Sequence, residues 1–343
     1  MEKKATMKKI AEELGISINA VSLALNNKHG VSEDTRLKVL AAAEAAGYIN
    51  QKARFAQTYQ RHNFCLMLQD IYSWDLEFYG AVLFAIEQES KKRGFGSLLN
   101  FFQDDGMKVP DCIRRRQVAG IITIGKISNE NVETLKSYGI PLVLVDHAYL
   151  SGSVDSIITN NRVGGFLSAK RLLELGFKEI GFFGDLNYSN SIRDRFAGYK
   201  DALASKLTGG SLEEYINEFS ITGENEKFVQ NNDFLSIKDT LLKSRIAQAY
   251  CCSNDFAAYV LIRALRSIDV SVPEEVSIIG FDNIALCEKM SPKLTTINVN
   301  KNLMGKKAVN RLIYLLEHKN EFTENTMLEV ELVERESVKT PEI

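Results

Sequence analysis

The sequence has no apolar segment approaching the roughly 18 residues needed to cross a bilayer. Its first residues, MEKKATMKKI, also lack the apolar stretch that a secretory signal carries between its positive charges and its cleavage site. These absences argue against a membrane protein or an exported protein. We therefore expect a protein that remains in the cytoplasm.

The five cysteines lack the paired CxxC spacing that is typical of a zinc site. They are Cys65, Cys112, Cys251, Cys252 and Cys287, and they lie mostly inside apolar runs, which favours buried thiols. A strand through AYCCSND would point the thiols of Cys251 and Cys252 to opposite faces. That geometry disfavours a disulfide or a shared metal there, so we expect no metal site.

Motifs of catalysis are also missing from the sequence. It contains only four histidines, His29, His62, His147 and His318, and no GxSxG elbow, HExxH helix, GxGxxG turn or phosphate-binding loop. A base and nucleophile would have to come from Asp146 and His147 with a distant serine or cysteine. We therefore expect neither an enzyme nor a bound cofactor.

Charge is distributed unevenly, although the formal net charge is only −2. Residues 1–61 contain ten Lys and Arg against six Asp and Glu, and the remainder carries a net charge of −6. A basic head on an acidic body indicates that only the head approaches a polyanion such as a nucleic acid.

The basic segment contains three helical patterns separated by short breaks. Thr6 is placed to cap the first helix, which Gly15 ends, and Ser17 is placed to cap the second. Ser32 begins the third helix, which ends before Gly47. The first helix carries Met7, Ile10, Ala11 and Leu14 on one face, and in the second Val21, Ala24 and Leu25 are predicted to face inward. In the third, helical spacing is followed by Leu37, Leu40, Ala41 and Glu44. A short helix, a tight turn and a second helix make a helix-turn-helix.

From Asn63 onward, short apolar strands alternate with longer amphipathic helices. This alternation predicts parallel sheets covered by helices, with enough strands for two sheets. Ligands in such folds bind beyond the carboxyl ends of the strands. The expected strands are Phe64–Leu68, Ser97–Phe102, Gly120–Ile124, Leu142–Val145, Ile180–Phe183, Ala249–Cys252 and Val276–Gly280. The expected helices include Phe78–Arg93, Val163–Leu175, Ile192–Ser205 and Phe256–Ile268.

Several ordered motifs resemble one known family. Thr6–Asn50 is similar to the DNA-binding head of LacI/GalR-type regulators. The segments VLVDH, NNRVGG, LLELGFKEIGFFGD, RDRFAGY, SNDFAA, VSIIGFDN and SPKLTTI resemble that family's core and occur in its order. Together they cover nearly the whole chain.

The resemblance implies an all-α helix-turn-helix head followed by an α/β, two-lobed core of the periplasmic-binding-protein type. Residues 1–50 would form the DNA-binding domain, 51–62 the hinge and 63–343 the effector-binding and dimerisation core. Lobe one would comprise about 63–160 and 299–321, and lobe two about 161–298 and 322–343. The implied function is a sequence-specific transcription regulator, and we expect a repressor that acts as a homodimer on double-stranded operator DNA.

Within the head, the family reads bases with the positions that are Ile18, Asn19 and Leu23 here. Asn can pair with an adenine edge, whereas Ile and Leu offer apolar contact such as with thymine methyl groups. For Ile18 and Leu23 the alternative is packing within the head. The positions that match backbone contacts are Thr6, Ser17, Ser22, Asn26 and His29.

Within the core, the resemblance places an effector between the lobes, and we expect a sugar or another small polar molecule. Carboxylates, amides and a guanidinium suit the hydroxyls of a sugar, and an indole face suits its apolar side. The matching residues are Trp74, Phe78, Asp146, Ser189, Ser191, Arg195, Asn254 and Asp282. The alternatives are helix caps or inter-lobe ion pairs for the polar residues and core packing for Trp74.

The hinge departs from the family pattern. Relatives have a Pro-Asn pair and a helix ending Ala-Arg-Ser-Leu, whose leucine wedges into the minor groove. Here Ala53 and Arg54 keep the Ala-Arg pair, but the leucine position falls on Ala56. We expect Lys52 and Arg54 to contact DNA with little bending, the alternative being that Phe55 acts as the wedge.

One further alternative concerns the effector. Some relatives respond to a partner phosphoprotein instead of a sugar, which would make the core a protein-docking module. A cleft containing Trp74, Arg195 and Asp282 favours a small ligand.

Overall fold

The computed structural model describes residues 6–25, 30–46, 48, 63–70, 76–206, 211–318 and 322–339. Five of the expected site residues lie outside these ranges, and their roles stay predictions. They are Asn26, His29, Lys52, Arg54 and Trp74. The departure of the hinge from the family pattern likewise falls outside the described residues.

In the described part of the head there are three short helices, and their apolar faces pack on one another. They are α1 (Met7–Leu14), α2 (Ile18–Leu25) and α3 (Glu33–Ala45). Thr6 accepts a hydrogen bond from the backbone N–H of Lys9, and Gly15 ends α1 with a left-handed φ of 64°. The hydroxyl of Ser17 accepts from the N–H of Ala20 at 3.0 Å and caps α2. The predicted caps of both helices are therefore confirmed.

The buried face of α3 differs from the set of residues with helical spacing. Leu37 is 40% exposed and Ala41 is exposed, so the helical spacing that these residues follow does not mark the buried face. The buried side chains of the helix are those of Arg36, Val39, Leu40, Ala42 and Ala43. The Arg36 guanidinium donates to the backbone carbonyls of Leu23 and Ala24, in the last turn of α2. This polar anchor turns α3 away from the orientation that Leu37 suggests.

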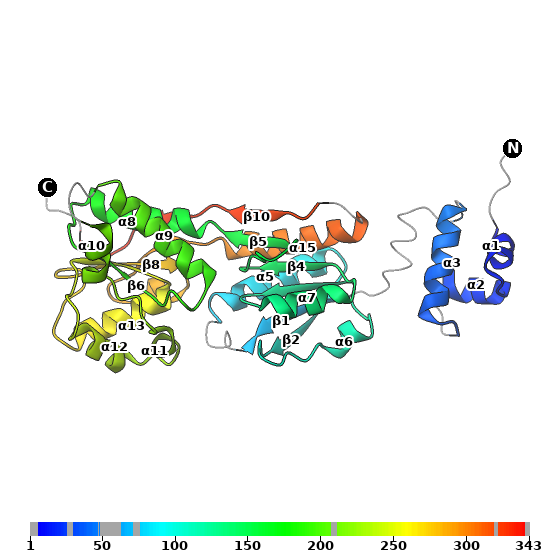
Figure 1. Cartoon of the computed structure of the whole chain (residues 1–343), viewed down its shortest axis with the longest axis horizontal. Coiled ribbons are helices and arrows are strands. Elements are labelled where there is room, and N and C mark those ends of the chain that lie inside the picture. The colour runs from blue at the N-terminus through cyan, green and yellow to red at the C-terminus, as the bar shows by residue number, and fades with distance from the viewer. Residues whose placement is uncertain are drawn as a thin grey trace.

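The first lobe is a parallel sheet with helices on both faces (Figure 1). Its strands follow the order β10-β5-β4-β3-β1-β2. The strands are β1 (Asn63–Gln69), β2 (Gly96–Phe102), β3 (Gly120–Ile124), β4 (Leu142–Val145), β5 (Asp155–Thr159) and β10 (Asn325–Leu328). The helices are α5 (Tyr79–Lys92), α6 (Asp111–Arg114), α7 (Asn129–Ser137) and α15 (Lys301–Glu317).

The second lobe has a sheet of order β11-β9-β8-β7-β6, in which only the β11–β9 pair is antiparallel. Its strands are β6 (Ile180–Phe183), β7 (Ala249–Cys252), β8 (Ser277–Asp282), β9 (Thr295–Asn298) and β11 (Glu331–Val333). Its helices are α8 (Asn161–Glu174), α9 (Asn190–Ala204), α10 (Leu212–Phe219), α11 (Glu226–Gln230), α12 (Phe234–Leu241), α13 (Asp255–Arg266) and α14 (Leu286–Lys289). The seven predicted strands are all present.

The chain passes between the lobes three times, near residues 160, 299 and 329 (Figure 1). The expected boundary at residue 322 is wrong, because β10 pairs with β5 in the first sheet. The last crossing therefore follows Leu328, where β10 ends and the chain continues to β11. No helix among the described residues is long and apolar enough to span a membrane.

Most of the thiols are buried, as predicted. Cys65, Cys251, Cys252 and Cys287 are buried, whereas Cys112 is half-buried. Cys251 packs in the cluster with Phe182 and Tyr199, and Cys252 packs in the other cluster with Phe183 and Tyr250. The two thiols therefore face opposite sides of β7, as the strand geometry requires.

Arg311 of α15 joins three segments of the first lobe. Its Nε donates to Asp155 of β5 at 2.6 Å, and its Nη2 donates to the carbonyl of Phe322 at 2.9 Å. The same Asp155 oxygen accepts from the N–H of Glu324, just before β10. The Arg311 and Asp155 side chains are only 8% and 5% exposed.

We expect Arg311→Ala to lower the free energy of unfolding by about 3–5 kcal/mol, because it leaves the Asp155 carboxylate buried without its cation. The control is Arg162→Ala, which breaks the exposed pair with Asp201 and should cost less than about 1 kcal/mol. Urea denaturation followed by circular dichroism measures both variants. If both variants lost the same free energy of unfolding, the buried Arg311–Asp155 pair would not be what stabilises β10 in the first lobe.

Candidate functional site

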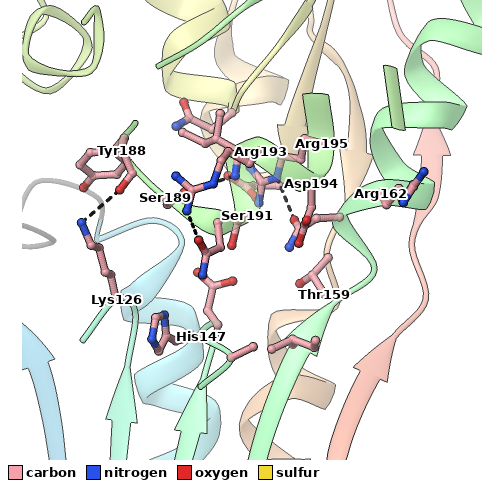
Figure 2. A pocket seen from close by; sticks show the side chains of 18 of the residues that line it. Lys126, His147, Thr159, Arg162, Tyr188, Ser189, Ser191, Arg193, Asp194 and Arg195 are labelled. Carbon is pink, nitrogen blue, oxygen red and sulfur yellow. Dashed lines mark hydrogen bonds and ion pairs between the residues drawn. The ribbon is translucent and has the colours of Figure 1, made fainter. Parts of the chain in front are cut away.

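A cavity of about 310 Å³ lies between the lobes, beyond the carboxyl ends of strands from both sheets. Seven of the eight expected effector residues line it, namely Phe78, Asp146, Ser189, Ser191, Arg195, Asn254 and Asp282. The eighth, Trp74, is outside the described residues. In Figure 2, Ser189, Ser191 and Arg195 lie on one side of the cavity, with His147 and Thr159 on the other.

Close packing of α8 against α9 positions Arg195. A Cβ added to Gly165 would come within 1.9 Å of the Arg195 carbonyl oxygen, and one added to Gly198 would come within 1.8 Å of the Arg162 carbonyl oxygen. Only glycine allows this approach at both positions. The two helices are therefore fixed against each other, and Arg195 projects from a rigid support.

The Arg195 guanidinium is almost completely committed to partners in its own lobe. It donates to Asn161 at 2.9 Å, to the Ser253 carbonyl at 2.5 Å and to Asp282 at 3.3 Å. Its planar group also lies 3.7 Å from the centre of the Phe281 ring. Arg195 is only 6% exposed, so it organises the floor of the cavity as well as lining it.

Asp146 follows β4 and enters the cavity from the first lobe. Its backbone has a left-handed φ of 58°, which is uncommon outside glycine and frequent at functional sites. The Tyr79 hydroxyl donates to Asp146 Oδ2 at 3.2 Å. Burial raises the pKa of Asp146 to about 6, Arg195 opposes this rise, and the Asp282 carboxylate adds to it.

Asp282 ends β8 and approaches from the second lobe. It also has a positive φ, 112°, and is 6% exposed. Burial raises the pKa of its carboxyl, while Arg195 and Lys301 lower it. Behind it, buried Asp255 accepts the N–H of Ile284 at 2.9 Å and thereby fixes the turn after β8.

Ser189 and Asn254 line the cavity and also cap helices. The Ser189 hydroxyl caps α9 by accepting from Ile192 N, and Asn254 Oδ1 caps α13 by accepting from Ala257 N at 2.7 Å. Each cap therefore uses one of the polar atoms that a ligand could otherwise contact. Phe78 is 3% exposed and packs edge-on to Tyr79, 4.9 Å between ring centres.

Several lining residues escaped the sequence analysis, among them Tyr79, Lys126, Asn160, Asn161 and Arg193. Lys126 follows β3 and Asn160 follows β5, so the rule that ligands bind beyond strand ends would have found both. His147 also lines the cavity, and burial lowers the pKa of its imidazole. No group of three or more His, Cys, Asp or Glu in the described ranges could hold a metal ion.

Direct contacts join the lobes around the cavity. Lys126 of the first lobe donates to the Tyr188 carbonyl of the second at 3.3 Å, as Figure 2 shows. On another side, Glu77 accepts from the N–H of Leu286 at 2.7 Å. These contacts exist only while the lobes are close together, so they stabilise one lobe arrangement.

In the head, the start of α2 presents polar and apolar groups to solvent. Ile18 is 48% exposed and Asn19 is exposed, whereas Leu23 is half-buried. Thr6 and Ser17 stand exposed before α1 and α2 and serve as their caps, and Ser22 is half-buried in α2. The first turn of α2 therefore carries its most accessible side chains.

Two parts of the chain match known families. Residues 6–51 match the family of bacterial regulatory proteins named lacI, and residues 169–338 match the periplasmic binding protein-like domain. The chain is 26% identical over 340 residues to the HTH-type transcriptional repressor PurR of Mannheimia succiniciproducens. The match covers 98% of this chain and 99% of that protein.

Two solved structures are similar to this one. A LacI family transcriptional regulator from Enterococcus faecium with bound ribose has a TM-score of 0.70 at 26% identity, covering 82% of this chain and 100% of that one. The lac repressor dimer bound to operator and the anti-inducer ONPF has a TM-score of 0.66 at 23% identity, covering 98% and 99%. The latter likeness establishes the fold across head and core.

The raised pKa of Asp146 predicts a pH-dependent difference in stability. Since its folded pKa of about 6 exceeds the ordinary value of 3.8, this group's contribution to stability is present below pH 4 and is lost as the pH rises through 6. Asp146→Asn should therefore be more stable than the parent at pH 7.5, by at most about 3 kcal/mol, with the difference shrinking toward pH 4. Urea denaturation across this range measures it, and a constant difference would contradict the assignment.

Proposed function

This chain belongs to the lacI family of bacterial regulatory proteins, and we propose that it represses transcription by binding operator DNA under the control of a small polar effector. The observation that supports this proposal is that the same chain has an exposed first turn of α2 and a polar cavity between two lobes. Because operator DNA is cytoplasmic in bacteria, the proposed function places the protein there.

The DNA-reading role falls to α2. Val21, Ala24 and Leu25 are buried on its inner side, while Ile18 and Asn19 are exposed at its N-terminal end. The N-terminal residues of a recognition helix are those that meet base edges in the major groove. Asn19 would supply paired hydrogen bonds to an adenine, and Ile18 would supply apolar contact.

Contacts to phosphates would position α2 without reading the sequence. Thr6, Ser17 and Ser22 are suited to this role by their hydroxyls. Asn26 and His29 are proposed for the same purpose on the basis of the family resemblance, and Lys52 and Arg54 are proposed to contact DNA from the hinge. The base contacts would then be made in a register that these groups set.

The effector is proposed to be a sugar or a sugar derivative. The cavity offers carboxylates from both lobes, amides and hydroxyls, which together can accept from and donate to several ring hydroxyls. The similar structure from Enterococcus faecium holds ribose. Asp146 and Asp282 would grip the ligand from opposite lobes, and Phe78 would form part of an apolar wall.

The signal would pass from the effector to the heads because residues of both lobes bind the same ligand. A ligand held by Asp146 on one side and Asp282 on the other favours the close arrangement that Lys126–Tyr188 and Glu77–Leu286 already stabilise. Differential affinity for one lobe arrangement is what couples the effector to the heads.

A homodimer completes the proposal. One head reads only a half-site, so a two-fold operator requires two copies. The first lobe exposes large apolar side chains on α5 and on the edge strand β2, with Phe84 66%, Leu99 46% and Phe101 53% exposed. A second copy of the chain would cover this face and also shield the edge of the sheet.

We expect Asn19→Ala to weaken binding to the specific operator by about 1–3 kcal/mol while leaving binding to random DNA nearly unchanged. The operator can be selected from genomic fragments, and fluorescence anisotropy measures both affinities at one salt concentration. Glu12→Gln, on the exposed side of α1, is the control. Equal losses on both DNAs would contradict a reading role for Asn19.

Calorimetry with a panel of pentoses, hexoses and disaccharides tests the effector. The parent protein should bind at least one of them, and Asp146→Asn should lose roughly tenfold or more in affinity, since a hydrogen bond to a charged group contributes about 1.5–3 kcal/mol. Glu130→Gln, exposed on α7, should bind like the parent. An unchanged affinity in Asp146→Asn, or no binding of any sugar, would contradict the proposed effector site.

A further inference from the structure

Two of the five cysteines are in contact although they lie on different elements. Cys65 is fully buried on β1, which lies next to the edge strand β2 of the first sheet, and Cys112 is half-buried on α6. The Cys112 thiol donates to the sulfur of Cys65 at 3.8 Å. The side-chain amide of Asn100, on the neighbouring strand β2, donates to the same sulfur at 3.3 Å.

The two elements differ in how far they can move. β1 pairs with β2 on one side and β3 on the other, so Cys65 is fixed. The α6 helix is a single turn of four residues, anchored in the core through Ile113, while Asp111 and Arg114 are exposed. A side-chain rotation of Cys112 with a small shift of α6 would bring the sulfurs from 3.8 Å to the roughly 2.05 Å of a disulfide.

The other cysteines lack such a neighbour for structural reasons. Cys251 and Cys252 are adjacent in sequence but face opposite sides of β7. Cys287 is buried on α14, and its thiol interacts with Asp255. These three thiols are therefore internal controls of similar burial.

We propose that Cys65 and Cys112 form an oxidisable pair, which a hydroperoxide converts into a reversible intramolecular disulfide. The half-buried Cys112 meets the oxidant first, since Cys65 is 0% exposed. This inference concerns the first lobe and does not depend on the proposed repressor function. Disulfides of this kind in reducing compartments are transient and serve as redox sensors.

The chemistry proceeds in two balanced steps. The Cys112 sulfur attacks the outer oxygen of the hydroperoxide, the O–O bond breaks, and Cys112 becomes a sulfenic acid while an alcohol or water leaves. The Cys65 sulfur then attacks the Cys112 sulfur, the S–OH bond breaks, and hydroxide takes the Cys65 proton to leave as water. Two electrons pass in total from the two thiols to the hydroperoxide.

The surroundings of Cys65 have opposing effects on the second step. Burial raises the pKa of the Cys65 thiol, which slows the attack because the proton must be lost as the S–S bond forms, whereas the hydrogen bond from Asn100 lowers this pKa. The Asn100 amide, which already donates to Cys65, would stabilise the negative charge that develops on the attacking sulfur. The resulting disulfide would tie α6 to the strand that begins at Asn63, where the described part of the core starts.

The test uses the full chain, reduced and then treated with hydrogen peroxide. After alkylation under denaturing conditions and proteolysis, mass spectrometry should find one linked peptide pair containing residues 65 and 112, which dithiothreitol separates. Cys251, Cys252 and Cys287 should remain alkylated. Cys112 oxidised without a link to Cys65, or a link between two chains through Cys112, would overturn the proposal.

Variants separate the two steps. Cys112→Ser, at the half-buried position, should give no linked pair, whereas Cys251→Ser should give the same pair as the parent. Cys65→Ser should accumulate a sulfenic acid on Cys112 that dimedone traps. Should Cys65→Ser not fold, thermal melting decides: the peroxide-treated parent should melt higher than the reduced parent, with no such shift in Cys112→Ser. A shift of equal size in Cys112→Ser would overturn the proposal.

Discussion

The geometry of the cleft depends on the buried guanidinium of Arg195. This one group contacts Asn161 of α8, the carbonyl of Ser253 just after β7, and Asp282 at the end of β8. A cation enclosed to this extent is tolerated only with partners on several sides. The carboxyl ends of the second sheet are therefore held in one arrangement before any ligand arrives.

Much of the fold could be predicted because local chemistry and tertiary packing agree. The strands at Gly120–Ile124, Leu142–Val145, Ile180–Phe183 and Ala249–Cys252 have the predicted bounds, since buried parallel strands read as short continuous apolar runs. The caps at Thr6 and Ser17 were predictable from hydroxyls that precede apolar periodicity. The cleft residues were predicted from the family resemblance, and seven of the eight line one cavity.

The features that could not be predicted from the sequence depend on contacts between residues that are far apart along the chain. The orientation of α3 depends on Arg36, whose partners are carbonyls of α2, and periodicity alone favoured Leu37. β10 and β11 are short, and all but one of their residues are exposed or half-buried, so their sequences carry no continuous run of buried apolar residues. Tyr79 lines the cleft, where its hydroxyl donates to Asp146. The two residues are 67 positions apart in the sequence, so no local pattern predicts this contact.

The return of β10 to the first sheet has a consequence for biosynthesis. The head is complete once its three helices have left the ribosome, but the first lobe lacks its outer strand until residue 328 emerges, and the second lobe lacks β11 until residue 333. Neither lobe can therefore complete its sheet until strands of the other lobe have also been synthesised. A nonsense codon at residues 329–331 would leave the helices of the head and β10 in the chain but remove β11, the edge strand of the second lobe.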